Sequence, residues 1–250
     1  MTARTIQPYT YDWFDPKNRP DYSHIVTEDD EPVDNTFSEK QQRLLTESLF
    51  SSSWTERDFV VFANVGLFHH LRRQPVVPDM MLSMDVVQLT KEEGETEDKH
   101  TKTYFIWEYG KPPDVVIEIV SNRKGNELSS KVDLYEQIGV PVYIVFDPDR
   151  HLTANLITAF RRPLDNPLSP YEETDDLTFP TVGLALMLWD GVYENLHETW
   201  LRWCALDGDI ILSGLEGMRV ERGRANAERE RAERYRQMLI AAGIDPDSQT

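Results

Sequence analysis

Three ionisable residues stand where a globular protein would normally place apolar ones: Glu118, Lys131 and Asp79. Glu118 is in the middle of a run in which residues 115–117 and 119–120 are all Val or Ile. An isolated carboxylate buried in such a strand costs several kcal/mol, or its pKa shifts until it is neutral. The sequence therefore predicts a partner for Glu118: a cation, a metal ion or a set of hydrogen-bond donors.

Lys131 falls on the packed face of a predicted helix. At about 100° per residue, it lies within the inward-facing stripe of a helix over residues 127–138. The apolar members of that stripe are Leu128, Val132, Leu134, Tyr135 and Ile138. Because this helix follows the strand that carries Glu118, Lys131 is a candidate charge partner for that carboxylate.

Asp79 comes directly after a proline within otherwise apolar, strand-like sequence. Two carboxylates from neighbouring strands and one lysine are the minimum set for metal-dependent phosphodiester hydrolysis. Paired carboxylate oxygens suit Mg²⁺ or Mn²⁺. The metal polarises the phosphoryl oxygen and lowers the pKa of bound water, while the lysine orients or activates that water.

Each of these residues also has a purely structural interpretation. An Asp after a proline is often a turn or cap residue. Glu118 and Lys131 could form a structural ion pair, and Lys131 could instead extend its ammonium into solvent. Residue types and spacing alone leave both interpretations open. A two-carboxylate glycoside hydrolase would use the acids but would leave Lys131 unexplained.

The charge balance limits the partners of the chain. Its 250 residues are 40% apolar and 10% aromatic, enough for the core of a globular fold. The 44 acidic residues outnumber the 26 Lys and Arg, which gives a formal charge of −18. This balance excludes an extended basic coat for nucleic acid, although a local cationic site remains compatible with it.

Cysteine and hydropathy patterns point to a cytoplasmic protein without a membrane partner. The single cysteine, Cys204, excludes an intrachain disulfide framework and a cysteine-based zinc site. The longest apolar stretch, residues 182–189, is far shorter than the roughly 20 residues that span a bilayer. The N-terminal segment lacks the apolar core of a secretion signal.

Two runs, residues 114–120 and 142–146, carry apolar residues on both strand faces, which is typical of strands inside a sheet that is covered on both sides. Between them, Asn126 can cap a helix that Gly139 ends. A strand, a helix and a strand with short links predict a parallel or mixed central sheet. The other expected elements are a helix from Ser38 to about residue 51, strands at 59–63, 65–68, 76–87 and 103–107, and a hairpin tip at 91–99.

The chain divides into an irregular arm over residues 1–35, a main domain over residues 36–214 and a charged helical tail over residues 215–250. Residues 219–236 contain seven Arg and four Glu. A weak heptad pattern makes the tail a candidate homodimer contact, but a solvated single helix with Glu–Arg pairs fits equally well. The heptad residues are Met218, Ala225, Ala232 and Leu239.

Three stretches carry a resemblance to a known family. They are PPDVVIEIVSNRKGNELSSKVDLYEQIGVPVYIVFDP, the preceding VVPDMMLSMDV and the later LWDGVYENLHETWLRWC. They resemble the Uma-type restriction endonucleases, which belong to the PD-(D/E)xK nuclease superfamily. The resemblance covers about residues 30–240. It implies an α/β fold with a mixed central sheet flanked by helices, and acids at the ends or kinks of two adjacent strands.

The resemblance also assigns roles by position. Asp79 matches the Asp of the PD element, and Glu118 matches the acid of the (D/E)xK strand. The lysine of that motif would stand at Val120; in the Uma-type group it lies on the following helix, where Lys131 matches. By analogy, the backbone carbonyl of Ile119 is a further metal ligand beside Asp79 and Glu118.

An acid of the first helix often assists in this superfamily, and either Glu39 or Glu47 could serve. The resemblance therefore implies a Mg²⁺- or Mn²⁺-dependent endonuclease whose substrate is DNA. The alternative is an inactive nuclease-like protein that binds a partner through its helical tail. The charge of −18 favours this alternative, because DNA would have to approach an acidic body.

Overall fold

The computed structural model describes residues 35–91, 99–121, 127–163, 166 and 169–243. The chain divides between Ile211 and Leu212 into two compact units. The expected N-terminal arm lies almost wholly outside the described residues, and so does most of the expected hairpin tip at 91–99.

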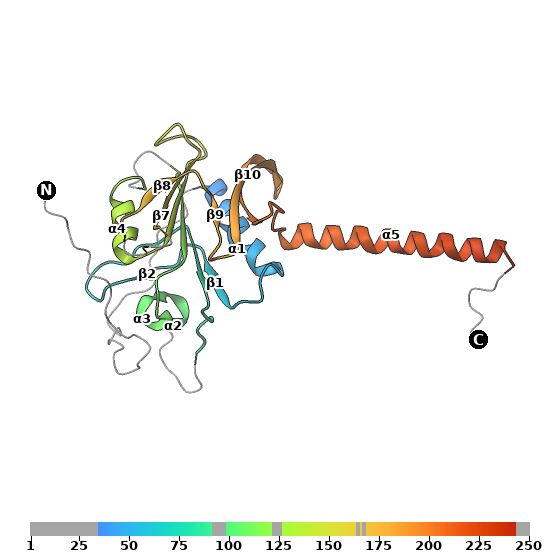
Figure 1. The fold of residues 1–250 in the computed structure, drawn as a ribbon, viewed down its shortest axis with the longest axis horizontal. Helices are drawn as coiled ribbons and strands as arrows, with labels where there is room; N and C mark the ends of the chain where they lie inside the picture. The colour runs from blue at the N-terminus through green and yellow to red at the C-terminus, as the bar shows by residue number, and fades with distance from the viewer. Residues whose placement is uncertain (1–34, 92–98, 122–126, 164–165, 167–168, 244–250) are drawn as a thin grey trace. The chain divides into compact units, whose positions relative to one another are not determined.

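A mixed sheet forms the centre of the first unit (Figure 1). Strands β5 (Val115–Ile119) and β6 (Val142–Phe146) run parallel, and the other neighbouring strands of this sheet run antiparallel. The parallel pair is joined by helix α4 (Ser130–Ile138), which confirms the predicted strand–helix–strand unit. Within the described residues the strand order is β1 (Phe59–Phe62), β3 (Met80–Met84), β5 (Val115–Ile119), β6 (Val142–Phe146), β7 (Ile157–Arg161) and β8 (Glu172–Thr174).

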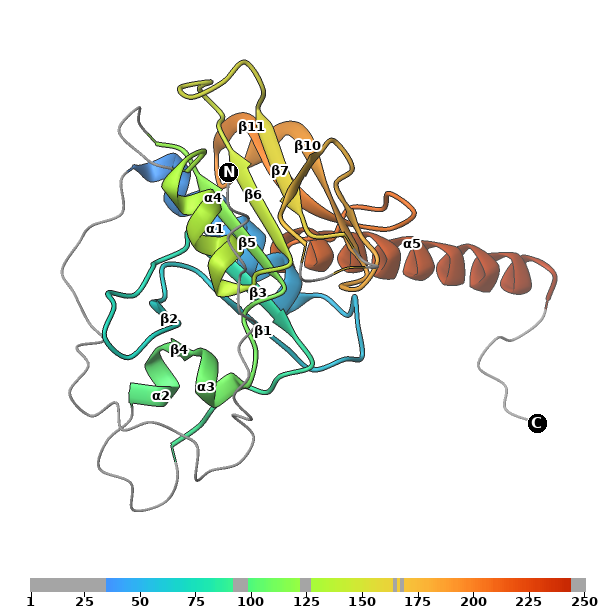
Figure 2. The same ribbon diagram turned by 60° about the vertical axis from the view of Figure 1, so that its left-hand side comes forward.

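The central strand β5 is buried at every position because both faces of the sheet are covered. On one face, Ile117 and Ile119 pack into a core shared with helix α1 (Thr36–Ser51). On the other face, Val116 and Val120 pack with Tyr135 of α4, and Figure 2 shows α4 lying against β5 and β6. Glu118 alternates with Ile117 and Ile119, so its side chain belongs to the α4 side.

Helix α1 begins two residues before the predicted start at Ser38. Asn35 supplies the cap, because its Oδ1 accepts a hydrogen bond from the backbone N–H of Ser38 at 2.8 Å. The apolar stripe is buried as the pattern predicts, but Gln41 and Gln42 are buried as well. The side chain of Gln41 donates to the carbonyl of Leu201 at 2.8 Å and accepts from its N–H at 2.9 Å, which ties α1 to strand β11 (Leu196–Ala205).

A second sheet is built on a long hairpin of β10 (Leu184–Tyr193) and β11 (Leu196–Ala205), with β9 (Thr178–Phe179) beside β10. The two-residue turn has positive φ at Glu194 and Asn195, 46° and 65°, as a hairpin turn that matches strand twist requires. Cys204 of β11 is buried, and burial raises the pKa of its thiol.

Two expected strands are wrong in extent. Residues 103–107 form only the short strand β4 (Tyr104–Phe105), between helices α2 (Lys99–Lys102) and α3 (Ile106–Tyr109); β4 pairs in parallel with β2 (Leu67–Phe68). This run is buried throughout, so it shows no alternation that could separate strand from helix. The strand expected at 76–87 is confined to β3, and Asp85 directly after it has a left-handed φ of 59°.

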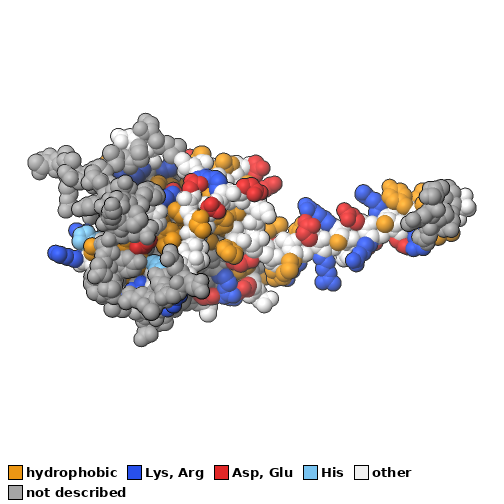
Figure 3. Space-filling view, turned by 90° about the horizontal axis from the view of Figure 1, so that it is seen from below, with side chains coloured by type: hydrophobic (Ala, Val, Ile, Leu, Met, Phe, Trp, Pro, Cys, Tyr) orange, Lys and Arg blue, Asp and Glu red, His pale blue; other side chains and the backbone are white. Residues whose placement is uncertain are grey.

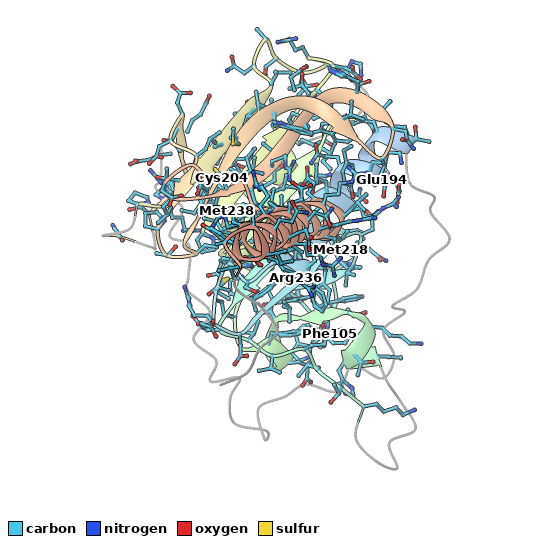
Figure 4. All side chains as sticks on the ribbon, turned by 90° about the vertical axis from the view of Figure 1, so that its right-hand side faces the viewer. Phe105, Glu194, Cys204, Met218, Arg236 and Met238 are labelled. Atoms are coloured by element: carbon cyan, nitrogen blue, oxygen red, sulfur yellow. The ribbon has the colours of Figure 1, made fainter. Side chains whose placement is uncertain are left out.

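The second unit contains helix α5 (Gly214–Ala241), and none of its residues is buried. It begins with a capping box in which Ser213 and Glu216 bond each other's backbone and side chain. Figure 3 shows basic and acidic side chains alternating along α5, and Figure 4 views it nearly end-on with Met218, Arg236 and Met238 labelled. No helix among the described residues is long and apolar enough to cross a membrane.

The bond between α1 and β11 makes a testable prediction. Gln41→Ala would leave the buried N–H and carbonyl of Leu201 without their partner, so we expect a loss of about 2 kcal/mol or more in the free energy of unfolding. Urea denaturation measures this loss. Phe50→Ser on the same helix is the control, since Phe50 is 82% exposed and its change should stay within about 0.5 kcal/mol. Equal losses in the two variants would contradict the bridging role.

Candidate functional site

The register of two antiparallel strands places the candidate acids side by side. In the pairing of β3 with β5, Met80 lies opposite Ile117, so one further residue along each strand brings Asp79 opposite Glu118. The carboxylate of Asp79 accepts a hydrogen bond at Oδ2 from the backbone N–H of Ile119 at 2.7 Å. Asp79 therefore lies directly before β3, in contact with the strand that carries Glu118.

Glu118 is only 2% exposed, and each of its carboxylate oxygens accepts a hydrogen bond from a side chain of α4. The Tyr135 hydroxyl donates to Oε1 at 2.6 Å, and the Lys131 ammonium donates to Oε2 at 3.0 Å. Lys131 and Tyr135 are four residues apart, so successive turns of α4 present them on one face. The structure thus brings Glu118 and Lys131 together.

Burial dominates the electrostatics of this pair. Burial raises the pKa of Glu118 from its ordinary 4.5 to about 8; the neighbouring charge of Asp79 adds to the rise, and the donors Lys131 and Tyr135 oppose it. Burial alone would lower the pKa of Lys131, but the carboxylates of Glu118 and Glu127 outweigh it and raise that pKa. The lysine therefore carries its charge at neutral pH, and burial makes Glu118 release its proton less readily than an exposed glutamate would.

Helix α1 contacts the site through Gln42. Its amide donates to Oδ1 of Asp79 at 2.9 Å, and its carbonyl oxygen accepts from the side chain of Asn64 at 2.8 Å. The acids expected to assist make other contacts: Glu39 pairs with Arg43, and Glu47 accepts from Ser51 at 3.0 Å. Gln42 was missed because a search for acids on this helix passes over a neutral amide.

Sequence reasoning also missed Glu127, which it treated as the first residue of a helix. The helix begins at Ser130, and residues 127–129 form a turn before it. Oε1 of Glu127 lies 3.4 Å from the Lys131 ammonium, and the Glu127 side chain is largely buried. The i,i+4 spacing of Glu and Lys is the signal that could have revealed this contact.

The oxygen ligands that Asp79 and Glu118 can offer are compatible with a hard divalent cation. Both side chains offer oxygen, and the backbone of Ile119 adjoins them. Across the described residues, no group of three or more His, Cys, Asp or Glu side chains is placed to hold a metal ion. Mg²⁺ is usually bound by one or two carboxylates and completes its shell with water, so a pair of acids suffices. The pKa of Glu118 is raised mainly by burial, and the charge of Asp79 adds to the rise.

The pKa of Glu118 predicts how stability depends on pH. Between pH 4.5 and 8 the folded chain holds a proton at Glu118 that the unfolded chain releases, so stability from this group is present at low pH and falls as pH rises through the window. The slope is at most about 1.4 kcal/mol per pH unit. The Glu118→Gln variant has no titratable group at this position. Its free energy of unfolding should therefore increase relative to that of wild type as the pH rises. Urea denaturation of both proteins across this window measures the difference, and a difference independent of pH would contradict the assignment.

Comparisons with known proteins place the chain in a family. The model of the family described as "Uma2: Putative restriction endonuclease" matches residues 25–188, which include Asp79, Glu118, Ile119 and Lys131. A search of curated proteins found no match. The matched segment covers well over half of the 250 residues and contains the central sheet with α1 and α4. The chain therefore belongs to the Uma2 family.

Proposed function

We propose that this protein is an endonuclease that hydrolyses DNA phosphodiester bonds with the help of Mg²⁺ or Mn²⁺. The observation that carries the proposal is a cluster of two acids and a charged lysine in a chain of this family. Asp79 is bonded to the strand of Glu118 at 2.7 Å, and Lys131 lies 3.0 Å from Glu118. A structural ion pair would account for Glu118 and Lys131, but it would not require Asp79 beside them.

In this proposal Asp79 and Glu118, with the backbone carbonyl of Ile119, hold the divalent cation. The cation supplies Lewis-acid stabilisation of the phosphoryl oxygen and a bound water of lowered pKa. Gln42 fixes one oxygen of Asp79 and Tyr135 fixes one oxygen of Glu118, so both carboxylates are held in place by neighbouring donors. Such preorganisation is what lets fixed charges stabilise a developing anion.

Lys131 acts as a charged donor in this scheme. Its raised pKa keeps it an ammonium at neutral pH, so it can orient the attacking water and offset the charge of the phosphate, but it does not accept a proton. Glu118 must lose its proton to ligate a cation, because ligands bind metal in their deprotonated form. Cation binding should therefore be coupled to proton release below about pH 8.

A second candidate function rests on helix α5. Several large apolar side chains of α5 are exposed, which suits an inactive nuclease-like protein that recruits a partner. Pairing with a second copy is opposed by charge, because arginines flank the heptad stripe on both sides and would face one another. The exposed side chains are Leu215, Met218, Val220, Tyr235, Met238, Leu239 and Ile240, and the flanking arginines are Arg222, Arg229 and Arg236 with Arg224 and Arg231.

Cleavage of supercoiled plasmid in Mg²⁺ or Mn²⁺ tests the nuclease proposal. Glu118→Ala and Lys131→Ala should each lower the cleavage rate by about 100-fold or more, because each removes charge from the reacting centre. Asp133→Ala is the matched control, since Asp133 is an exposed acid of the same helix and should cut like wild type. Circular dichroism would show that each variant is folded. If both site variants cut as well as wild type, the assignment is wrong.

Sedimentation tests the recruitment of a second copy. Because of the facing arginines, we expect both the full chain and a chain ending before Arg219 to sediment as monomers. Removal of residues 219–250 should leave the first unit folded, since no residue of α5 is buried. A dimer that becomes a monomer on truncation would contradict this expectation and would favour the scaffold function.

A further inference from the structure

Glu127 is a buried carboxylate with an incomplete set of partners. The residue is 9% exposed, and its Oε1 lies 3.4 Å from the ammonium of Lys131. Its Oε2 is shielded from solvent and has no hydrogen-bond partner among the described residues. Burying a carboxylate oxygen in this way is unfavourable unless a positive charge compensates for it. Within the described part of the chain, the cation that contacts Glu127 is Lys131.

The backbone holds Glu127 in this position. Its carbonyl oxygen accepts a hydrogen bond from the hydroxyl of Tyr143 at 2.8 Å, and Tyr143 is a fully buried residue of β6. The turn that precedes α4 is thereby attached to the strand beside Glu118. Glu127 is fixed near Lys131 from the sheet as well as through the helix that follows it.

Lys131 consequently lies between two carboxylates, Glu118 at 3.0 Å and Glu127 at 3.4 Å. Tyr135 occupies the other oxygen of Glu118 at 2.6 Å. A divalent cation that binds Glu118 must share this carboxylate with an ammonium, and like charges at such separations repel. The ammonium therefore needs a different carboxylate at the moment when Glu118 takes up the cation.

The charges around the site are consistent with such an exchange. Asp79, Glu118 and Glu127 carry three negative charges when ionised, and Lys131 carries one positive charge, which leaves −2. One divalent cation would neutralise this remainder. Without Glu127 the same site would be −1, and the cation would meet an ammonium with no second carboxylate beside it.

We propose that Glu127 is a positioning residue: it receives the Lys131 ammonium when a divalent cation binds Glu118, and so keeps the ammonium beside the site. This inference rests on the proposed function, because it requires the cation. It differs from a ligand role, in which Glu127 itself would bind the cation.

Calorimetric titration of the full chain with Mn²⁺ alone tests this role through a double-mutant cycle. In Glu127→Gln the ammonium stays on Glu118 and competes with the cation, so the Kd for Mn²⁺ should rise by about 10-fold. In a Lys131→Gln background there is no ammonium to place, so adding Glu127→Gln should change the Kd by less than about twofold. Asp133→Asn, which removes an exposed charge from the same helix, is the control and should bind Mn²⁺ like wild type.

The outcomes separate this inference from the proposed function. If Glu127→Gln weakens binding equally in both backgrounds, Glu127 acts on the cation directly and the positioning role is wrong. If binding is lost in Glu118→Gln but unchanged in Glu127→Gln, the metal site stands and the role of Glu127 is wrong. If wild type binds no Mn²⁺, the proposed metal site is wrong, and the proposed role of Glu127 is wrong as well.

Discussion

The buried carboxylate of Glu118 is the constraint on which the rest of the site depends. A strand inside a sheet covered on both faces gives a charge little access to water, so neighbouring groups must compensate for it. Helix α4 supplies two donors from successive turns, and these fix the rotation of the helix about its axis. The crossover that joins β5 to β6 is thus packed by apolar contacts and oriented by polar ones.

Asp79 and Gln42 extend this constraint to the other side of the sheet. Asp79 uses one oxygen to bond the backbone of Ile119 and the other to accept from Gln42, so strand β3 and helix α1 are both tied to the position of Glu118. Gln42 is in turn held by Asn64, which has a positive φ of 53°. Side chains from distant parts of the sequence therefore converge on one carboxylate pair, and this convergence is a property of the fold.

The sequence predicted the parts of the site that violate local expectation. Glu118 interrupts an apolar strand, and Lys131 interrupts an apolar helix face, so their types and positions made them candidate partners. Gln42 and Glu127 violate nothing in their own segments: an amide on α1 and an acid before a helix are ordinary residues there. Their roles come from tertiary contacts, which a pattern along the chain does not contain. The same reason explains β4 and α3, where a run that is buried on all sides shows no period.

Cys204 has a practical consequence. Burial in β11 raises the pKa of its thiol, so little of the reactive thiolate forms and reagents have poor access to it. Because the chain has one cysteine, we expect the folded protein to react only slowly with maleimides without any substitution. A cysteine introduced at an exposed position, on α5 for example, would then carry a fluorophore or spin label almost exclusively, and the signal would report on that position alone.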